Sequence, residues 1–328
     1  MSRNLAGRQV NPIGLGCMSL SWAYGVPPGE DHAIELLNKA LDLGYDHLDT
    51  ANIYGLGHNE TLLGKALKGR RSEFFLATKM GIVVQGPDRG IDCSPQAIRR
   101  EIEGSLRRLQ TDCVDLYYMH RFDPKVPVAD MAGAMGDLIA EGKIGSYGVS
   151  EWSAAHIRAA HAVTPMAAVQ TEYSLWTRNP EIAVLNTCLE LDITLVAFSP
   201  VARGVLAGGV RDVAALPEKD LRRTMPRFNA DNWPVNLALV DRFNAIAARE
   251  GVAPAQLSLA WVLSRGDHIV AIPGTASLDH LAMNIARGDW AMPVELVGEL
   301  DRLINRHTVA GPRYGSMIQQ TIDTEEFS

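Results

Sequence analysis

The stretch YDHLDTANIYG, residues 45–55, decides how the rest of the chain is interpreted. Its first five residues alternate, with Tyr45, His47 and Asp49 on one side, which is typical of a β-strand. The alternation ends in Asn-Ile-Tyr-Gly, residue types that favour a loop. A carboxylate, Asp49, is therefore predicted at the end of a strand and a phenol, Tyr54, on the loop that follows it. Because a buried, unpaired carboxylate is costly, we expect Asp49 to have a partner elsewhere in the chain.

Two later strand-like runs supply partners, since one ends in Lys79 and the other in His120. A carboxylate keeps a neighbouring ammonium charged, and an ammonium lowers the pKa of a nearby phenol from its usual value of about 10. Asp49, Lys79 and Tyr54 are thus predicted to form a tuned proton donor. His120 is predicted to hydrogen-bond a substrate carbonyl and polarise it. No side chain supplies hydride, so carbonyl reduction at this site would require a nicotinamide cofactor.

Strand-like runs alternate with helical patterns along most of the chain, which predicts an α/β fold of the (β/α)8 TIM-barrel type in one domain, residues 1–328. The eight strand-like runs are Gly16–Leu20, Tyr45–Asp49, Phe74–Lys79, Cys113–His120, Ile144–Ser150, Ala167–Thr171, Ile193–Ser199 and His268–Pro273. The helical patterns are Glu30–Leu43, Pro95–Leu109, Pro127–Glu141, Ser153–Ala162, Pro180–Leu191, Pro234–Arg249 and Leu278–Arg287, with a further one resuming near Gly57.

Two segments lie outside this alternation. Asn4–Ile13 is predicted to be an N-terminal β-hairpin that closes the barrel floor, and Pro200–Trp233 is predicted to be a long loop after the seventh strand. A loop of that length in a compact domain is usually functional. The rival fold, an open doubly wound sheet, is marked by G-x-G-x-x-G after its first strand. Here Gly14 and Gly16 are followed by Ser19, so that signature fails.

Composition narrows the class of protein. The chain is 47% hydrophobic and 21% charged, as in ordinary globular proteins, and its formal net charge is −7. An acidic chain is a poor match for nucleic acid or an anionic membrane surface. No run of eighteen apolar residues predicts a membrane span, and the N-terminus lacks the apolar core of a signal peptide. The four cysteines have no paired spacing. We therefore expect a cytoplasmic protein with free thiols, and a homo-oligomer stays open.

Several motifs together resemble the aldo-keto reductase family over nearly the whole chain: D-T-A at 49–51, Y-G at 54–55, G-L-G at 14–16, and I-P-G-T at 272–275. The resemblance implies a catalytic tetrad of Asp49, Tyr54, Lys79 and His120, with Tyr54 as proton donor. It also implies that NADPH lies extended across the barrel mouth, with a small carbonyl compound as the substrate. The implied cofactor-binding residues are Gly16, Cys17, Met18, Asp49, Ser150, Gln170, Phe198, Ser199, Val201, Gly204, Leu206, Gly274, Thr275, Ser277, His280 and Asn284.

By the same resemblance, each part of the cofactor has its own residues. Ser150 and Gln170 would hold the carboxamide, and Phe198 would stack on the nicotinamide ring. The pyrophosphate would be wrapped by Ser199, Val201, Gly204 and Leu206. The adenosine end would be taken by Thr275, Ser277, His280 and Asn284.

The chain also departs from the family pattern. Glu151 stands where many members carry Asn, and Gly274 and His280 stand where many carry the Lys and Arg that grip the 2′-phosphate of NADPH. The sequence therefore allows the use of NADH as well as NADPH. The long loop and the segment EYSLW, residues 172–176, are more similar to the bacterial, pyridoxal-reductase-like branch than to animal aldose reductases. That branch implies substrate contacts from Trp22, Tyr24, Tyr54 and His120, with Arg121 and Trp152 as further candidates.

Other functions fit parts of the same constellation. His47, Asp49 and His120 would suit a metal-dependent hydrolase, although Lys79 would crowd a cation, so no metal is predicted. A nucleotide-binding, redox-sensing subunit, similar to the potassium-channel β proteins, would share the fold and the tetrad. A Schiff-base aldolase would need Lys79 as a neutral amine beside Asp49, which the carboxylate opposes.

Overall fold

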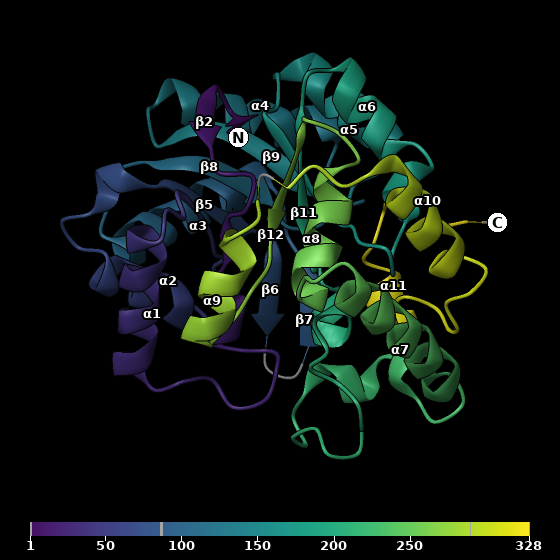
Figure 1. The fold of residues 1–328 in the computed structure, drawn as a ribbon. Coiled ribbons are helices and arrows are strands. Elements are labelled where there is room, and N and C mark those ends of the chain that lie inside the picture. Colours follow the sequence, from purple (N-terminus) through teal and green to yellow (C-terminus); the bar gives the residue numbers. More distant parts are fainter. Residues whose placement is uncertain (1, 86–87, 289, 328) are drawn as a thin grey trace.

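Eight parallel strands form a barrel in the computed structural model, which describes residues 2–85, 88–288 and 290–327 (Figure 1). Their order in the sheet is the order in the chain, so each strand lies beside the next one. The strands are β3 (Leu15–Gly16), β4 (His47–Asp49), β5 (Phe75–Met80), β8 (Val114–Met119), β9 (Ile144–Ser150), β10 (Ala168–Glu172), β11 (Thr194–Phe198) and β12 (Ile269–Ile272). Parallel bridges from Ile13 to Ala271 and from Gly16 to Gly274 join the first strand to the last. The predicted (β/α)8 barrel is confirmed.

The floor of the barrel is closed by an N-terminal hairpin, as predicted. Strand β1 (Arg3–Leu5) pairs antiparallel with β2 (Arg8–Val10). Leu5 and Val10 are fully buried and belong to the cluster of side chains that fills the barrel interior. Because the floor is sealed by apolar packing, the C-terminal ends of the strands form the open face.

Helices surround the barrel. They are α1 (Glu30–Asp42), α2 (His58–Ala66), α3 (Pro95–Leu109), α4 (Val128–Ala140), α5 (Ala154–Val163), α6 (Val184–Glu190), α7 (Trp233–Arg249), α8 (Pro254–Leu263), α9 (Leu278–Ile285), α10 (Val294–Leu303) and α11 (Ser316–Gln319). Helix α3 begins where expected, because the Ser94 hydroxyl accepts from the backbone N–H of Ala97 at 3.3 Å and Pro95 occupies the first turn.

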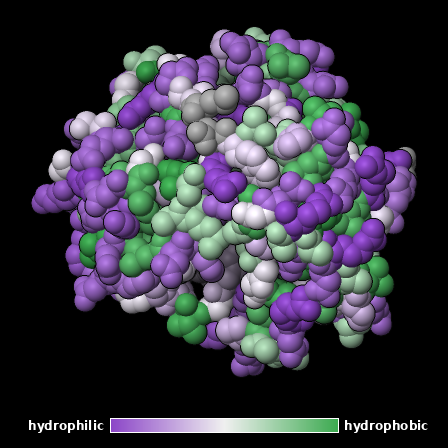
Figure 2. All heavy atoms as spheres, in the orientation of Figure 1, coloured by the Kyte–Doolittle hydropathy of each residue, from purple (hydrophilic) through white to green (hydrophobic). Residues whose placement is uncertain are grey.

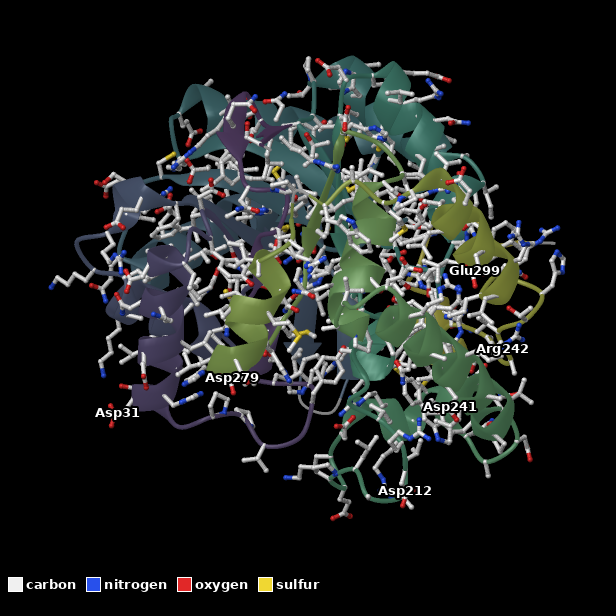
Figure 3. The ribbon with its side chains drawn as sticks, in the orientation of Figure 1. Asp31, Asp212, Asp241, Arg242, Asp279 and Glu299 are labelled. Carbon is white, nitrogen blue, oxygen red and sulfur yellow. The ribbon has the colours of Figure 1, made fainter. Side chains whose placement is uncertain are left out.

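Charged side chains lie on the outside of this shell. Asp31 and Asp212 lie at the outer edge of the view in Figure 3, and Asp279 is exposed on α9. The face in Figure 2 mixes polar groups with scattered apolar ones. Within the described ranges, no helix has the length and apolar character that crossing a bilayer requires.

The structure differs from the predicted elements in three places. The predicted first strand, Gly16–Leu20, is a strand at Leu15–Gly16 alone, because Cys17 has helical dihedral angles and a 3₁₀ turn, η1 (Met18–Leu20), follows. A hairpin of β6 (Ile82–Gln85) and β7 (Asp88–Ile91), absent from the prediction, stands between β5 and α3. The long loop after the seventh strand also contains two 3₁₀ helices, η5 (Leu221–Thr224) and η6 (Pro226–Phe228), and a kinked segment of turns, η4 (Ala202–Ala207), in which Arg203 and Gly204 have positive φ.

The predicted helices lack α8, α10 and the single-turn α11, and the first two were missed for different reasons. Eight of the residues in α8 are buried, so this helix has no polar face and no helical periodicity of hydrophobicity. Helix α10 does have an apolar stripe, Leu296, Leu300 and Leu303, and that spacing was a readable signal.

Candidate active site

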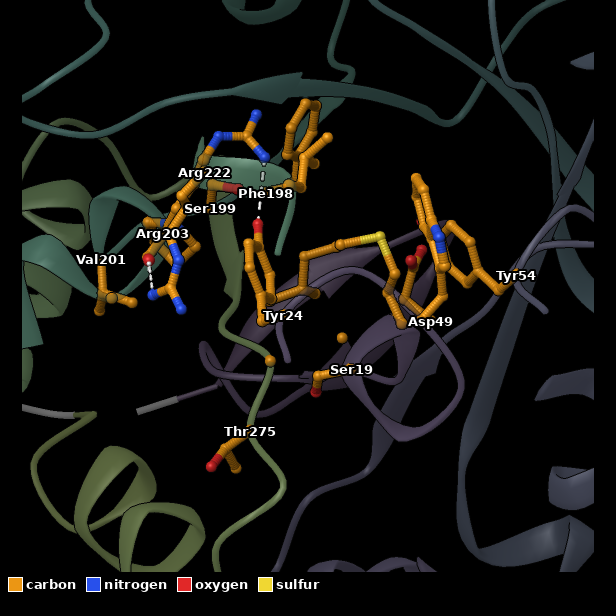
Figure 4. Close-up of a pocket in the computed structure, with 18 of the residues that line it drawn as sticks. Ser19, Tyr24, Asp49, Tyr54, Phe198, Ser199, Val201, Arg203, Arg222 and Thr275 are labelled. Atoms are coloured by element: carbon orange, nitrogen blue, oxygen red, sulfur yellow. Dashed lines mark hydrogen bonds between the residues drawn. The ribbon is translucent and has the colours of Figure 1, made fainter. Parts of the chain in front are cut away.

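A cavity of about 880 Å³ opens at the C-terminal ends of the barrel strands (Figure 4). Most of the predicted site residues line it: Gly16, Met18, Trp22, Tyr24, Asp49, Tyr54, His120, Ser150, Gln170, Phe198, Ser199, Val201, Gly204, Gly274, Thr275, His280 and Asn284. Four predicted residues do not line it: Cys17, Lys79, Leu206 and Ser277. Cys17 and Leu206 are buried in the core, and Ser277 caps α9 with its hydroxyl. Lys79 lies directly behind the cavity wall.

Asp49, Lys79 and Tyr54 meet behind this wall. The carboxylate of Asp49, at the end of β4, forms a buried ion pair with the ammonium of Lys79 on β5. The ammonium also donates to the backbone carbonyl of Thr50 at 2.8 Å and lies 3.4 Å from the phenol oxygen of Tyr54. The second carboxylate oxygen of Asp49 accepts from Nε2 of Gln170 at 2.7 Å. The partner that the sequence demanded for Asp49 is therefore Lys79.

The protonation states follow from burial and from these contacts. Burial opposes a charge on Lys79, but Asp49 and Tyr54 outweigh it and raise the pKa of its ammonium. Burial raises the pKa of Tyr54, and the ammonium of Lys79 pulls that pKa down by less. Lys79 thus lowers the pKa of the phenol as expected, but the net pKa of Tyr54 is raised and not lowered, because desolvation of a fully buried phenol exceeds the effect of one neighbouring charge.

His120, at the end of β8, is neutral. Burial, the guanidinium of Arg121 and the ammonium of Lys79 hold the pKa of its imidazole well below the usual range. Its ring lies edge-on to the ring of Tyr54, with 6.0 Å between centroids, and Nδ1 has no hydrogen-bond partner among the described residues. A neutral imidazole and a protonated phenol thus share one side of the cavity, and both can hydrogen-bond to a carbonyl oxygen.

Arginines from the long loop build the opposite side of the cavity. Arg203 donates to the phenol oxygen of Tyr24 at 3.1 Å and to the carboxylate of Glu172 at 2.7 Å. Arg222 donates to the backbone carbonyl of Arg203 at 3.1 Å (Figure 4). It also pairs with Asp220. This pair of guanidinium groups lies beside Val201 and Gly204 with Glu172 and Asp220 as counter-ions, and guanidinium N–H groups suit a phosphate as hydrogen-bond donors.

A buried charge network lies behind Arg203 and fixes the C-terminal tail. Arg313 pairs with both Glu151 and Glu172, and the Tyr314 hydroxyl donates to Glu172 at 2.7 Å. Glu151 also accepts from the Thr324 hydroxyl at 2.8 Å. The departure at position 151 therefore has a structural reason, since Glu151 does not line the cavity and instead anchors the tail.

The tail adds cavity residues that the sequence reasoning missed, namely Tyr314, Met317, Ile318 and Thr321. The sequence gives no periodic signal for them, because α11 is a single turn held in place by Arg313 and Tyr314. Trp152, named as a further substrate contact, is instead fully buried and packs edge-on against Phe122 at 5.0 Å between ring centroids.

At the far end of the cavity, backbone segments approach one another closely. A Cβ atom at Gly274 would lie 3.0 Å from the carbonyl oxygen of Gly16, so this position needs glycine where β3 and β12 meet. Gly204 has a φ of +88°, which also favours glycine. Thr275, His280 and Asn284 lie beyond Gly274 and complete a groove that joins the strand ends to helix α9. Its length, phosphate-facing arginines and polar far end fit a dinucleotide.

The contacts give less support to a metal-dependent hydrolase or a Schiff-base aldolase than to carbonyl reduction. Both oxygens of Asp49 are engaged, by Lys79 and by Gln170, and His47 packs edge-on to Phe75 inside the barrel. Among residues 2–85, 88–288 and 290–327, no group of three or more His, Cys, Asp and Glu side chains could hold a metal ion. A raised pKa keeps Lys79 protonated, which opposes its use as a Schiff-base nucleophile.

Comparison with known proteins places this geometry in a family. The model of the "Aldo/keto reductase family" matches residues 12–305. An aldo-keto reductase of Strobilurus tenacellus is 38% identical over 99% of the chain and 98% of its own length. A glycerol dehydrogenase from Gluconobacter oxydans superposes with a TM-score of 0.86 at 28% identity, covering 95% of this chain and 97% of that one. An aldo-keto reductase from Klebsiella pneumoniae, solved with NADPH, has a TM-score of 0.72 at 27% identity, covering 96% and 99%.

Proposed function

The chain belongs to the aldo/keto reductase family, whose activity is carbonyl reduction with a nicotinamide cofactor, and on that premise we propose that it reduces aldehydes or ketones with Tyr54 as proton donor. The observation that carries this role is the distance of 3.4 Å between the Tyr54 phenol oxygen and the Lys79 ammonium, at the edge of the cavity.

Each catalytic side chain has one task. NADPH, when bound, supplies hydride to the carbonyl carbon. Tyr54 donates its phenolic proton to the carbonyl oxygen, which completes the alcohol and leaves a phenolate. The ammonium of Lys79 stabilises that phenolate, and Asp49 keeps the ammonium charged. Neutral His120 donates a hydrogen bond to the same oxygen and orients the carbonyl towards Tyr54.

NADPH is the proposed cofactor, and the Klebsiella pneumoniae relative solved with NADPH supports it. Ser150 and Gln170 would hold the carboxamide and Phe198 would face the nicotinamide ring, since all three line the cavity beside Asp49. Arg203 and Arg222 would face the pyrophosphate. The adenosine end would meet Thr275, His280 and Asn284. No Lys or Arg is among these three, so we propose NADH as an alternative cofactor.

The test is loss of NADPH absorbance with a panel of aldehydes. Glyceraldehyde comes first, because one relative is a glycerol dehydrogenase, followed by pyridoxal and methylglyoxal. We expect turnover with at least one aldehyde and its loss in Tyr54→Phe. Tight NADPH binding with no turnover on any carbonyl would instead favour a redox-sensing subunit. We further propose a cytoplasmic location, which suits the four free cysteines; a homo-oligomer stays a prediction.

A further inference from the structure

Charges around the cavity are unevenly distributed. The one carboxylate among the described lining residues is Asp49, and Lys79 already neutralises it. Four arginines line the same cavity: Arg89, Arg121, Arg203 and Arg222. Glu172 and Asp220 neutralise the last two, which lie on the long-loop side assigned to the cofactor. The cationic surplus is therefore on the other side, around the catalytic phenol.

Arg121 is the cation nearest the chemistry. It follows His120 directly at the end of β8, and its Nη1 donates to the His120 carbonyl at 2.6 Å and to the Ser150 hydroxyl at 3.5 Å. Nε and Nη2 have no acceptor in the part of the chain that the structure describes, and no carboxylate there forms an ion pair with this side chain. Its charge acts to lower the pKa of both Tyr54 and His120, which puts the guanidinium within electrostatic reach of both reacting groups.

The guanidinium of Arg121 is half-buried and has no counter-ion among the described residues. Partial desolvation of this group costs free energy, and an ion pair with a bound anion would offset that cost. Two free donors on one planar group match the two oxygens of a carboxylate or a phosphate. A second cation stands at the rim, where Arg89 stacks over the Trp22 ring at 5.2 Å. An anion that enters the cavity would thus meet the charge of Arg89 at the opening and that of Arg121 further inside.

We propose that Arg121 binds an anionic group, a carboxylate or a phosphate ester, carried by the carbonyl substrate, so that the preferred substrates are charged aldehydes or ketones. This inference rests on the proposed carbonyl reductase activity and assigns its substrate class. The anion pairs with Arg121 while the carbonyl oxygen of the same molecule reaches Tyr54 and His120. Arg121 is then a specificity-determining residue, and the proton still comes from Tyr54.

The experiment compares matched pairs of substrates that differ in one charge. Glyceraldehyde 3-phosphate is set against glyceraldehyde, and succinic semialdehyde against its neutral amide, each with saturating NADPH. We expect kcat/KM for at least one charged partner to exceed that of its neutral partner by about tenfold or more. Arg121→Met should lower this ratio by about tenfold, mainly through KM, and Arg121→Lys should restore part of it because the charge returns. The two pairs distinguish a carboxylate from a phosphate ester.

A control and a second readout keep the outcome clear. Arg211 lies on the same long loop as the cofactor arginines but outside the cavity lining, and it pairs with Asp241. Arg211→Met should leave the charged-to-neutral ratio as in the wild type. Binding of succinate and of inorganic phosphate to the enzyme–NADP⁺ complex, followed by calorimetry, should weaken in Arg121→Met for one of the two anions.

Equal ratios in the wild type and Arg121→Met, with equal anion binding, would overturn the role of Arg121 while neutral aldehydes are still reduced. Absence of turnover on every aldehyde would instead contradict the proposed function, and calorimetry would still decide whether Arg121 holds an anion.

Discussion

The two sides of the cavity are built in different ways. On one side, the reacting groups Asp49, Lys79 and His120 sit at the ends of neighbouring strands, and Tyr54 follows on a short loop. On the other side, Arg203 is held by a network that joins β10, the long loop and the C-terminal tail. The first side places each group by the register of parallel strands. The second depends on ion pairs that join Glu172 to Arg203, 31 residues away, and to Arg313, 141 residues away. The barrel strands therefore position the proposed catalytic groups, whereas ion pairs position the opposite, cofactor-facing side of the cavity.

The largest effect should come from the strand-end side. Tyr54→Phe removes the proton donor while keeping the ring, so the kcat of carbonyl reduction should fall by about a thousandfold or more. Binding of NADPH, followed by quenching of protein fluorescence, should change little because the ring still fills its place. A kcat near that of the wild type would move the proton donor elsewhere.

The next effect concerns the charge network on the other side. Arg313→Met leaves the buried carboxylates of Glu151 and Glu172 without their shared cation, which should lower the free energy of unfolding by about 3 kcal/mol or more. Urea unfolding measures it. The matched control is Arg99→Met, which breaks an exposed pair with Asp137 and should shift the midpoint far less. Equal shifts in both variants would mean that the network does not hold the tail.

A smaller effect tests the adenosine end of the groove. His280→Arg supplies a cation for a 2′-phosphate, so the preference for NADPH over NADH should rise about tenfold, or about 1.4 kcal/mol. The ratio of kcat/KM for the two cofactors measures it. Asp279→Arg is the control, because this neighbour on α9 does not line the cavity and points outwards (Figure 3). A similar rise in both variants would indicate a general charge effect.

The smallest expected effect is that of pH on the kcat of reduction. Tyr54 must be protonated to act as an acid, and burial keeps its pKa above the usual value of about 10. His120 has a pKa well below its usual range and is neutral from about pH 6 upwards. The kcat of reduction with saturating NADPH should therefore vary less than about twofold between pH 6 and 9, and fall only above that range as the phenol ionises. A fall centred near pH 7 would show that Lys79 outweighs burial.

Much of the strand-end side was predictable because its signals are local. Period-two alternation marked β4, largely apolar strand-like runs marked β5 and β8, and polar residues at the end of each run marked the candidate reacting groups. The weak points were positions where local pattern and tertiary context disagree. Helix α8 is buried all round and so carries no periodicity. The segment after Gly16 turns into a 3₁₀ helix, closed by the backbone N–H of Leu20, which donates to the Cys17 carbonyl.

The sequence alone determined the barrel and pointed to the candidate reacting groups, because strand pattern and strand-end residue types are both local features of a few neighbouring residues. Tertiary structure alone decided the direction of the Tyr54 pKa shift, the structural use of Glu151, and the entry of the C-terminal tail into the cavity wall. Each of these depends on how deeply a polar group is buried and on which distant charge meets it, and neither quantity can be read from neighbours in the chain.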